Sequence, residues 1–211
     1  MFRFTRYIFV NDKSQREDGH SDAPSDGRPV RADAQRSLDA LLQAAKTVFA
    51  TSGVDAPVRE IAEKAGVGVG TVYRHFPQRA DLVAAVFRRE IDACAAAAPA
   101  LAAAHEPGVA LTKWIERYMD FIGTKRGLAK ALHSGDPAFE PLPGYFGKNL
   151  VPALRDLLDA AAAAGEIRAD VDAKDLVNAV ANLSHGGPEQ ARPMVALLLD
   201  GLRYGAKQSS A

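Results

Sequence analysis

The sequence predicts an all-α fold, with an N-terminal three-helix unit in residues 34–81 and a larger helical domain in residues 82–205. Apolar residues recur at three- and four-residue steps through both regions, which is the period of an α-helix. Glycine and proline residues divide these runs into segments of helical length. Runs that alternate apolar and polar residues with a period of two are absent, so we expect no β-sheet.

Residues 1–33 and 206–211 are predicted to be tails. After its first ten residues the N-terminal segment mixes both charges with Gly, Pro, Ser and Asp, and it lacks a helical period, so we expect disorder. The opening MFRFTRYIFV lacks the continuous apolar core of a signal peptide. Arg28 and Arg31 could lie along a DNA backbone, but an unstructured leader is the interpretation that the sequence favours.

The first helix is expected from Ala34 to about Ala50. Its apolar side chains form one stripe: Leu38, Leu41, Leu42, Ala45, Val48 and Phe49. Gly53 ends this helix, and Pro57 is well placed to begin the next one.

Residues 58–81, VREIAEKAGVGVGTVYRHFPQRAD, predict two short helices, a tight turn between them and the start of a third helix. The first short helix has Ile61 and Ala62 on its inner face, and Gly66 allows the chain to reverse. The second, from about Val69 to Phe76, directs four polar side chains outward: Thr71, Tyr73, Arg74 and His75. An ordinary pair of packed helices has no reason to expose such a set, so the pattern predicts a helix-turn-helix that enters the DNA major groove.

The run TVYRHFPQRADL, preceded by VREIAEKAGV and an amphipathic helix, resembles the N-terminal domain of TetR-type (TetR/AcrR) transcriptional repressors over about residues 36–90. The segment GEIRADVDAKDL at 165–176 resembles the SbtR-like branch of that family. This resemblance implies a homodimer that binds double-stranded DNA at a palindromic operator and is released by a small-molecule effector. One departure is Gly68, where many relatives carry a serine or threonine that could cap the helix or contact a phosphate.

DNA contacts are expected from the reading helix and the residues that flank it. Val69 could touch a thymine methyl group, and the glycines would let the backbone approach the bases closely. The predicted DNA-binding residues are Arg59, Gly68, Val69, Gly70, Thr71, Tyr73, Arg74, His75 and Arg79.

Composition sets limits on this interpretation. The whole chain has zero net charge, and residues 36–90 carry eight basic and six acidic side chains, so the positive field must be local and modest.

The single Cys94 excludes an intrachain disulfide and suits a reducing cytoplasm. No apolar run is long enough to span a bilayer, and the chain contains no GxSxG, Walker or HExxH motif. We therefore expect a cytoplasmic non-enzyme without metal or cofactor.

A long helix is predicted from Arg79 or Ala80 towards Pro99, and it is the element best placed to transmit a signal between the two regions. Further helices are expected at about 108–123, 127–134, 145–164, 172–184 and 188–204.

Trp114, Tyr118 and Phe121 form an aromatic stripe on one of these helices. The stripe could be ordinary core or the wall of an apolar ligand cavity, and the resemblance makes the two interpretations about equal. The candidate ligand-binding residues are Trp114, Tyr118, Phe121, His133, Tyr145 and Asn182.

The last two helices carry more apolar side chains than one chain needs to cover, so they predict a homodimer interface. Its candidate residues are Leu176, Val180, Leu183, Met194, Leu197, Leu198 and Leu202. The sequence thus favours a sequence-specific repressor. The alternative is a helical ligand-binding or scaffolding protein whose DNA-binding unit is degenerate and non-specific.

Overall fold

The computed structural model describes residues 28–132, 134–184 and 188–208, which contain helices and no strand. The expected all-α fold is therefore confirmed. In chain order the elements are α1 (Arg28–Ser52), α2 (Val58–Ala65), α3 (Val69–His75), α4 (Arg79–Ala104), α5 (Pro107–Leu132), the 3₁₀ turn η1 (Pro137–Phe139), α6 (Leu142–Ala163), α7 (Ala173–Leu183) and α8 (Pro188–Gln208).

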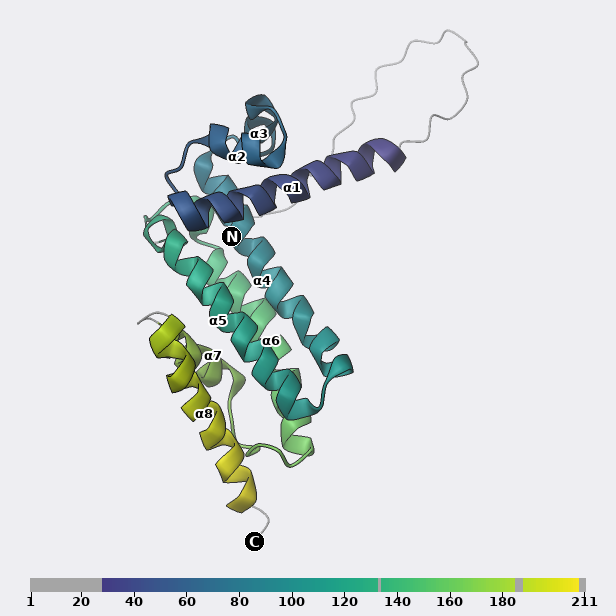
Figure 1. Cartoon of the computed structure of the whole chain (residues 1–211), viewed down its shortest axis with the longest axis vertical. Helices are drawn as coiled ribbons and strands as arrows, with labels where there is room; N and C mark the ends of the chain where they lie inside the picture. Colours follow the sequence, from purple (N-terminus) through teal and green to yellow (C-terminus); the bar gives the residue numbers. More distant parts are fainter. Residues whose placement is uncertain (1–27, 133, 185–187, 209–211) are drawn as a thin grey trace, which may run out of the picture.

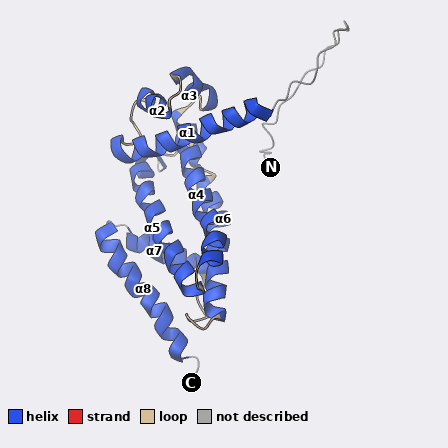
Figure 2. Ribbon diagram, turned by 45° about the vertical axis from the view of Figure 1, so that its right-hand side comes forward, coloured by secondary structure: helices blue, strands red, loops and turns tan. Residues whose placement is uncertain are grey.

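The molecule is elongated, with α1, α2 and α3 gathered at one end (Figure 1). Helices α4, α5 and α6 run side by side along the long axis and pack against one another. Helix α7 packs on α6, and α8 lies on the outside of the bundle next to α5 and α7 (Figure 2). Helix α4 is shared by both regions, because it packs against α1 as well as against α5 and α6.

Helix α1 begins at Arg28, six residues before the predicted start at Ala34. The prediction of a tail through residue 33 is therefore corrected for residues 28–33. Pro29 lies in the first turn, where its missing N–H costs no hydrogen bond, and no glycine follows until Gly53. The residues after Gly27 thus contain nothing that must break a helix.

Two helices run through residues that were expected to end them. Helix α4 continues past Pro99 to Ala104, and α5 joins the two predicted helices at 108–123 and 127–134 into one. Pro99 is exposed, and its neighbours are mostly alanine, the strongest helix former. A glycine inside a helix costs only about 1 kcal/mol, which burial of the adjoining α5 residues offsets. Likewise, α8 extends to Gln208, beyond the predicted end of the domain at residue 205.

The centre of the bundle is built on the aromatic residues of α5. Trp114 and Tyr118 are fully buried, and their rings stack with centroids 5.6 Å apart. The Trp114 indole N–H donates to the carbonyl oxygen of Cys94 at 2.9 Å, and the Tyr118 hydroxyl donates to that of Val177 at 3.3 Å. Because a buried polar group without a partner is costly, these two bonds fix how α4 and α7 pack on α5.

None of the helices in the described parts of the chain is both long and apolar enough to cross a membrane.

Candidate nucleic-acid interface

Helices α2 and α3 meet at a turn that the sequence builds from Gly66. This residue has φ 68°, in the left-handed region that glycine adopts at little cost. The Gly66 N–H donates to the Glu63 carbonyl at 3.1 Å, and the Val67 N–H donates to the Ala62 carbonyl at 3.0 Å. These are the two bonds of a Schellman motif, which ends α2 abruptly and directs the chain into α3.

Helix α3 is anchored on one side and open on the other. Val72 is buried and Phe76 is half-buried against the core of this unit. On the opposite side Tyr73, Arg74 and His75 are exposed, and the Tyr73 side chain has 52% of its surface accessible. A helix of seven residues therefore presents an aromatic ring, a guanidinium and an imidazole to solvent. Such side chains can bind phosphates and base edges.

The N-terminal end of α3 is nearly bare. Gly68 caps the helix without a side-chain hydrogen bond, and Val69 is exposed over 38% of its surface. A Cβ atom added at Gly70 would meet nothing within 4 Å. Backbone and a single valine thus form this end, as the sequence predicted, and Thr71 is half-buried beside it.

Helix α2 adds exposed charge next to this surface. The Arg59 guanidinium donates to Glu63 one turn away at 3.1 Å, but both side chains are largely exposed. Such a pair contributes little to stability and is screened by water and salt, so Arg59 can exchange its partner at low cost. Lys64 is exposed on the same helix and was not among the predicted residues. Lys64 lies in the last turn of α2, just before the turn at Gly66, and this position is the feature of the sequence that could have identified it.

Arg79 has a different place from the one expected. It was predicted to contact DNA, but its guanidinium donates to the backbone carbonyls of Val54 and Ala56 in the connection between α1 and α2. These bonds fasten the first residue of α4 to the helix-turn-helix. The structure thus assigns Arg79 a positioning role.

Two further polar links join α1 to α4. The Lys46 ammonium group lies 2.6 Å from the Glu90 carboxylate, and Arg89 donates to the Asp39 carbonyl at 2.6 Å. The Lys46–Glu90 pair is partly buried, so water screens it less than a surface pair. Together with the Arg79 bonds, these contacts hold α1, α2, α3 and the first half of α4 as one unit, which we call the head (residues 28–90). The predicted boundary at residues 81/82 falls inside α4.

Comparison with known proteins identifies this arrangement. The chain is 39% identical to the TetR transcriptional regulator SCO0520 of Streptomyces coelicolor, whose crystal structure it matches with a TM-score of 0.68. That match covers 78% of this chain and 97% of the other. The chain belongs to the TetR family of transcriptional regulators.

Other matches agree with this assignment. A TetR transcription regulatory protein of Mycobacterium vanbaalenii is 36% identical, with a TM-score of 0.65, over 83% of this chain and 99% of its own. Residues 41–86 match the family model for bacterial regulatory proteins of the tetR family, and residues 106–204 match the C-terminal domain of SbtR-like transcriptional regulators. An HTH-type transcriptional regulator of Staphylococcus aureus strain USA300 is 34% identical over 64 residues, which are 30% of this chain and only 35% of that relative.

In this TetR-family chain the predicted ligand-binding residues that the structure describes divide between the packed core and the surface. Trp114 and Tyr118 belong to the packed core described above, and Phe121 is buried beside them. The Tyr145 hydroxyl donates to the Asp92 carboxylate at 2.6 Å near the surface, and this bond raises the tyrosine pKa. Asn182 is exposed on α7. His133 lies outside the described residues.

The core that holds these aromatics also holds Cys94. Burial raises the pKa of the Cys94 thiol to about 12, although the nearby Arg117 guanidinium opposes the shift. Burial likewise raises the pKa of the Tyr118 hydroxyl. Both groups are therefore neutral at physiological pH. Among the described residues, no group of three or more His, Cys, Asp or Glu side chains could hold a metal ion.

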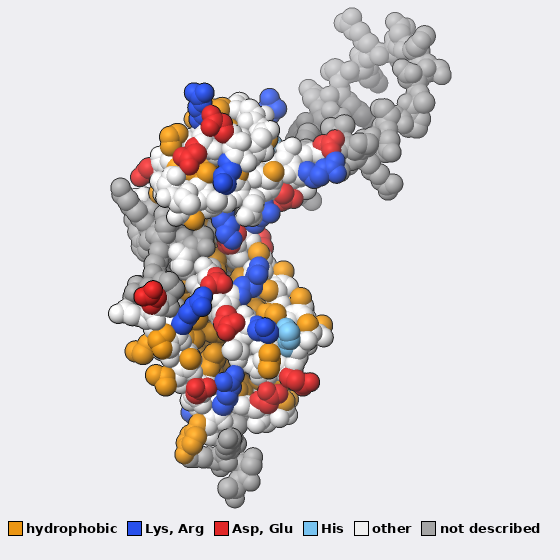
Figure 3. All heavy atoms as spheres, in the orientation of Figure 1, with side chains coloured by type: hydrophobic (Ala, Val, Ile, Leu, Met, Phe, Trp, Pro, Cys, Tyr) orange, Lys and Arg blue, Asp and Glu red, His pale blue; other side chains and the backbone are white. Residues whose placement is uncertain are grey.

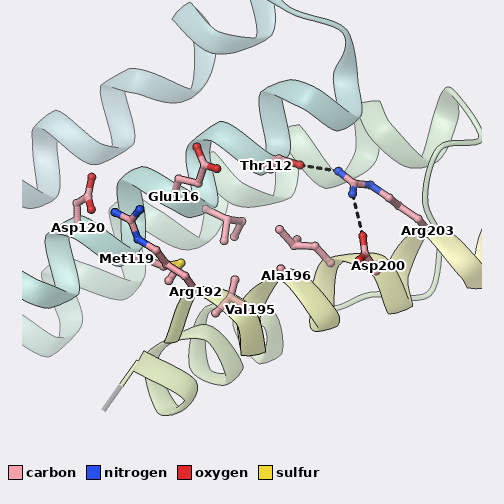
Figure 4. A pocket seen from close by; sticks show the side chains of 11 residues that line it. Thr112, Glu116, Met119, Asp120, Arg192, Val195, Ala196, Asp200 and Arg203 are labelled. Atoms are coloured by element: carbon pink, nitrogen blue, oxygen red, sulfur yellow. Dashed lines mark hydrogen bonds and ion pairs between the residues drawn. The ribbon is translucent and has the colours of Figure 1, made fainter. Parts of the chain in front are cut away.

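A cleft of about 440 Å³ lies between α5 and α8, away from the aromatic core (Figure 4). Helix α5 contributes Thr112, Ile115, Glu116, Met119 and Asp120, and α8 contributes Arg192, Val195, Ala196, Leu199, Asp200 and Arg203. Sequence reasoning missed this cleft, because only tertiary packing places the two helices opposite each other. The spacing of Arg192 and Arg203, about three helical turns, does indicate that they share one face.

The predicted dimer residues divide into two groups. Leu176, Val180 and Leu202 are buried within the chain, and Leu183 and Leu198 are half-buried against the same core. Met194 and Leu197 are instead exposed over 50% and 68% of their surfaces. Tyr204, two turns beyond Leu197 and 67% exposed, extends the exposed set. We call Met194, Leu197 and Tyr204 the outer stripe of α8, and Figure 3 shows hydrophobic side chains gathered along this edge.

Proposed function

We propose that this TetR-family regulator is a cytoplasmic repressor without enzymatic activity, which binds a palindromic operator as a homodimer and is released by a small, largely apolar ligand. The observation that carries the proposal is the exposed set Tyr73, Arg74 and His75 on a helix whose opposite side is anchored through Val72. A rigidly held helix with outward polar side chains is what readout in the major groove requires.

In this proposal Arg74 contacts bases or the adjacent phosphates, and Arg59 and Thr71 assist it. Tyr73 and His75 contact phosphates, and Lys64 adds a further positive charge nearby. The glycines at 68 and 70 let the backbone approach the bases, and Val69 meets a thymine methyl group. Phosphate contacts fix the position of the protein, while the base contacts specify the sequence.

The outer stripe of α8 is the basis of the proposed dimer. Met194, Leu197 and Tyr204 expose apolar surface along one side of a helix, and a second copy related by a two-fold axis would cover it. Two reading helices separated by about 34–36 Å, or a multiple of that distance, would then match two half-sites. This arrangement gives more specificity than one seven-residue helix can provide.

The first test is selection of genomic fragments with purified protein at physiological salt, followed by sequencing. We expect a palindrome whose half-sites lie about 10 base pairs apart or a multiple of that spacing. Random fragments would contradict the repressor assignment.

Substitution of Arg74 tests the proposed contacts. We expect Arg74→Ala to weaken operator binding by about 1–3 kcal/mol while folding is unchanged, because the side chain is exposed. The matched control is Arg155→Ala, an exposed arginine on α6. Equal affinity of Arg74→Ala and the control would remove Arg74 from the contact surface.

A second candidate function is favoured by the bare end of α3. With Gly68, Val69 and Gly70 as its leading residues, the helix has few side chains there that can form hydrogen bonds to bases. A helical scaffolding or ligand-binding protein with a non-specific DNA unit would show the same features. For both, the logarithm of the DNA affinity should fall linearly with the logarithm of the salt concentration. The two functions differ in the ratio of specific to non-specific affinity, which stays large only for a repressor.

A further inference from the structure

In the connection between α5 and α6, residues 134–139 form a defined turn that we call the strut. Gly135 has φ 79°, in the left-handed region that favours glycine, so the chain can reverse its direction there. The Asp136 carboxylate then accepts a hydrogen bond from the Ala138 N–H at 2.9 Å and caps the start of η1. These local signals give the strut its shape and place Phe139 at its end.

Phe139 packs where the head begins. It is buried, with 6% of its surface exposed, and η1 packs against α4. Phe139 lines a cavity of about 280 Å³ together with Val54 of the α1–α2 connection and Val83 of α4. Arg79, which bonds the carbonyls of Val54 and Ala56, lines the same cavity. The strut thus meets the head at the point where α4 is attached to the helix-turn-helix.

Helix α5 contacts the head at a second place. It packs against α1, and the C-terminal ends of these two helices lie side by side in both ribbon views (Figures 1 and 2). Phe121 of α5 also lines a cavity of about 180 Å³ with Lys46 of α1 and Glu90 of α4. A head joined to the bundle by α4 alone could bend with that helix. Here a change of angle has to disturb the contact with α5 or the packing of Phe139.

We propose that Phe139 is a positioning residue for the DNA-reading head. By packing on the start of α4 it fixes the angle between the head and the bundle, and in a dimer this angle sets the separation and relative rotation of the two reading helices. One added base pair moves a half-site by about 3.4 Å and rotates it by about 34°. A dimer whose heads are held at a fixed angle therefore accepts one half-site spacing and rejects the neighbouring ones.

The proposal has two separable parts. The part that concerns half-site spacing rests on the proposed dimeric repressor. The part that concerns the angle of the head depends only on contacts within one chain, so it is measured without DNA.

The angle of the head is tested by pulsed electron paramagnetic resonance on the full chain. Spin labels are attached at two exposed positions, Lys64→Cys in the head and Asp159→Cys on α6, in a chain that also carries Cys94→Ala. Labelled chain is diluted into unlabelled chain, so that the measured distances lie within one chain. We expect Phe139→Ala to shift or broaden the distance distribution by about 3 Å or more, the step between base pairs that the head has to resolve. An unchanged centre and width would overturn the positioning role.

Three further variants separate positioning from a general loss of stability. Phe139→Leu keeps an apolar side chain against α4 and should retain the natural distribution. Asp136→Ala removes the cap of η1 and should broaden the distribution less than Phe139→Ala, and it decides the test if Phe139→Ala does not fold. Leu158→Ala, a buried truncation near the end of α6, is the control and should leave the distribution unchanged. Circular dichroism confirms folding of each variant. Equal broadening by Leu158→Ala would reject the proposal.

The effect on spacing is measured on the operator recovered by fragment selection, with its half-sites moved together or apart by one base pair. For the natural chain we expect each change to lower the affinity at least about tenfold, because one head then loses base contacts. For Phe139→Ala we expect a loss of less than about threefold, because the head can adjust its angle. Phe139→Leu and Leu158→Ala should behave as the natural chain does.

Two results would overturn the role in spacing. One is equal affinity of the natural chain for all three spacings, and the other is an equally steep dependence on spacing in Phe139→Ala. Failure to recover any operator would reject the repressor function instead. The distances between spin labels would still decide whether Phe139 fixes the angle of the head.

Discussion

Helices α5 and α8 carry similar apolar patterns but have opposite environments. In α5 the stripe of Trp114, Tyr118 and Phe121 is buried, and the polar atoms of Trp114 and Tyr118 are bonded to backbone carbonyls. In α8 the stripe of Met194, Leu197 and Tyr204 is exposed. The difference is position: α5 lies between α4, α6 and α7, whereas α8 is the outermost helix and has neighbours on one side only (Figure 1). Helical periodicity thus identifies a face, but it does not identify what covers that face.

The largest effect is expected from Trp114→Ala. Removing a fully buried indole leaves a cavity in the middle of the α4–α5–α7 core and should lower the free energy of unfolding by about 3–5 kcal/mol. Urea unfolding measured by circular dichroism checks this value. Tyr204→Ala on the outer stripe is the control and should change the stability of the single chain by less than about 0.5 kcal/mol. Similar decreases in the free energy of unfolding for the two variants would contradict the difference in burial between the two stripes.

The second effect is a dependence of stability on pH that comes from Cys94 of α4, whose carbonyl accepts the hydrogen bond of Trp114 in the buried stripe. Burial holds the Cys94 thiol neutral, with a pKa of about 12 instead of its ordinary 9.0. Because the folded-state pKa is the higher one, this stabilisation is complete below pH 9 and is lost between pH 9 and 12, at about 1.4 kcal/mol per pH unit. Unfolding of the natural chain and of Cys94→Ala should be compared at pH 7 and about pH 10.5. A decline of equal size in both proteins would show that Cys94 is not its cause.

The smallest effect on the stability of a single chain, and the most informative about α8, is expected from Leu197→Ser. The exposed position should change that stability by less than about 0.5 kcal/mol. In sedimentation, however, we expect the variant to be a monomer and the natural chain to be a dimer. Leu199→Ser, two residues along and buried, should instead destabilise the fold by about 2 kcal/mol or more. A dimer of unchanged affinity in Leu197→Ser would place the interface elsewhere.

Most of the fold was predictable because it depends on local signals. Gly66 as a helix end, Val72 as an anchor and the outward set on α3 all follow from spacing within about 20 residues. Helix boundaries were less predictable. The cost of Pro99 is offset by the helix propensity of its alanine neighbours, and the cost of Gly123 is offset by burial of the adjoining α5 residues.

The candidate sites were predictable only in part, since each depends on contacts between distant segments. Nothing in the sequence near Arg79 indicates that its guanidinium reaches the carbonyls of Val54 and Ala56. The cleft requires Glu116 and Arg192, which are 76 residues apart in the sequence, to lie on two helices that pack side by side. The aromatic stripe of α5 fits a cavity wall and a core equally well from its sequence, and in the structure Trp114, Tyr118 and Phe121 are buried.

The bonds from Arg79 to the connection between α1 and α2 also have a mechanical consequence. Because these bonds attach its first residue to the helix-turn-helix, the start of α4 and the helix-turn-helix would move together. Its 26 residues give an arm of about 39 Å. A tilt of about 5° around the far end moves the near end by about 3 Å, close to the ~3.4 Å spacing of stacked base pairs. A rotation of this size inside the bundle would therefore shift α3 by about one base step.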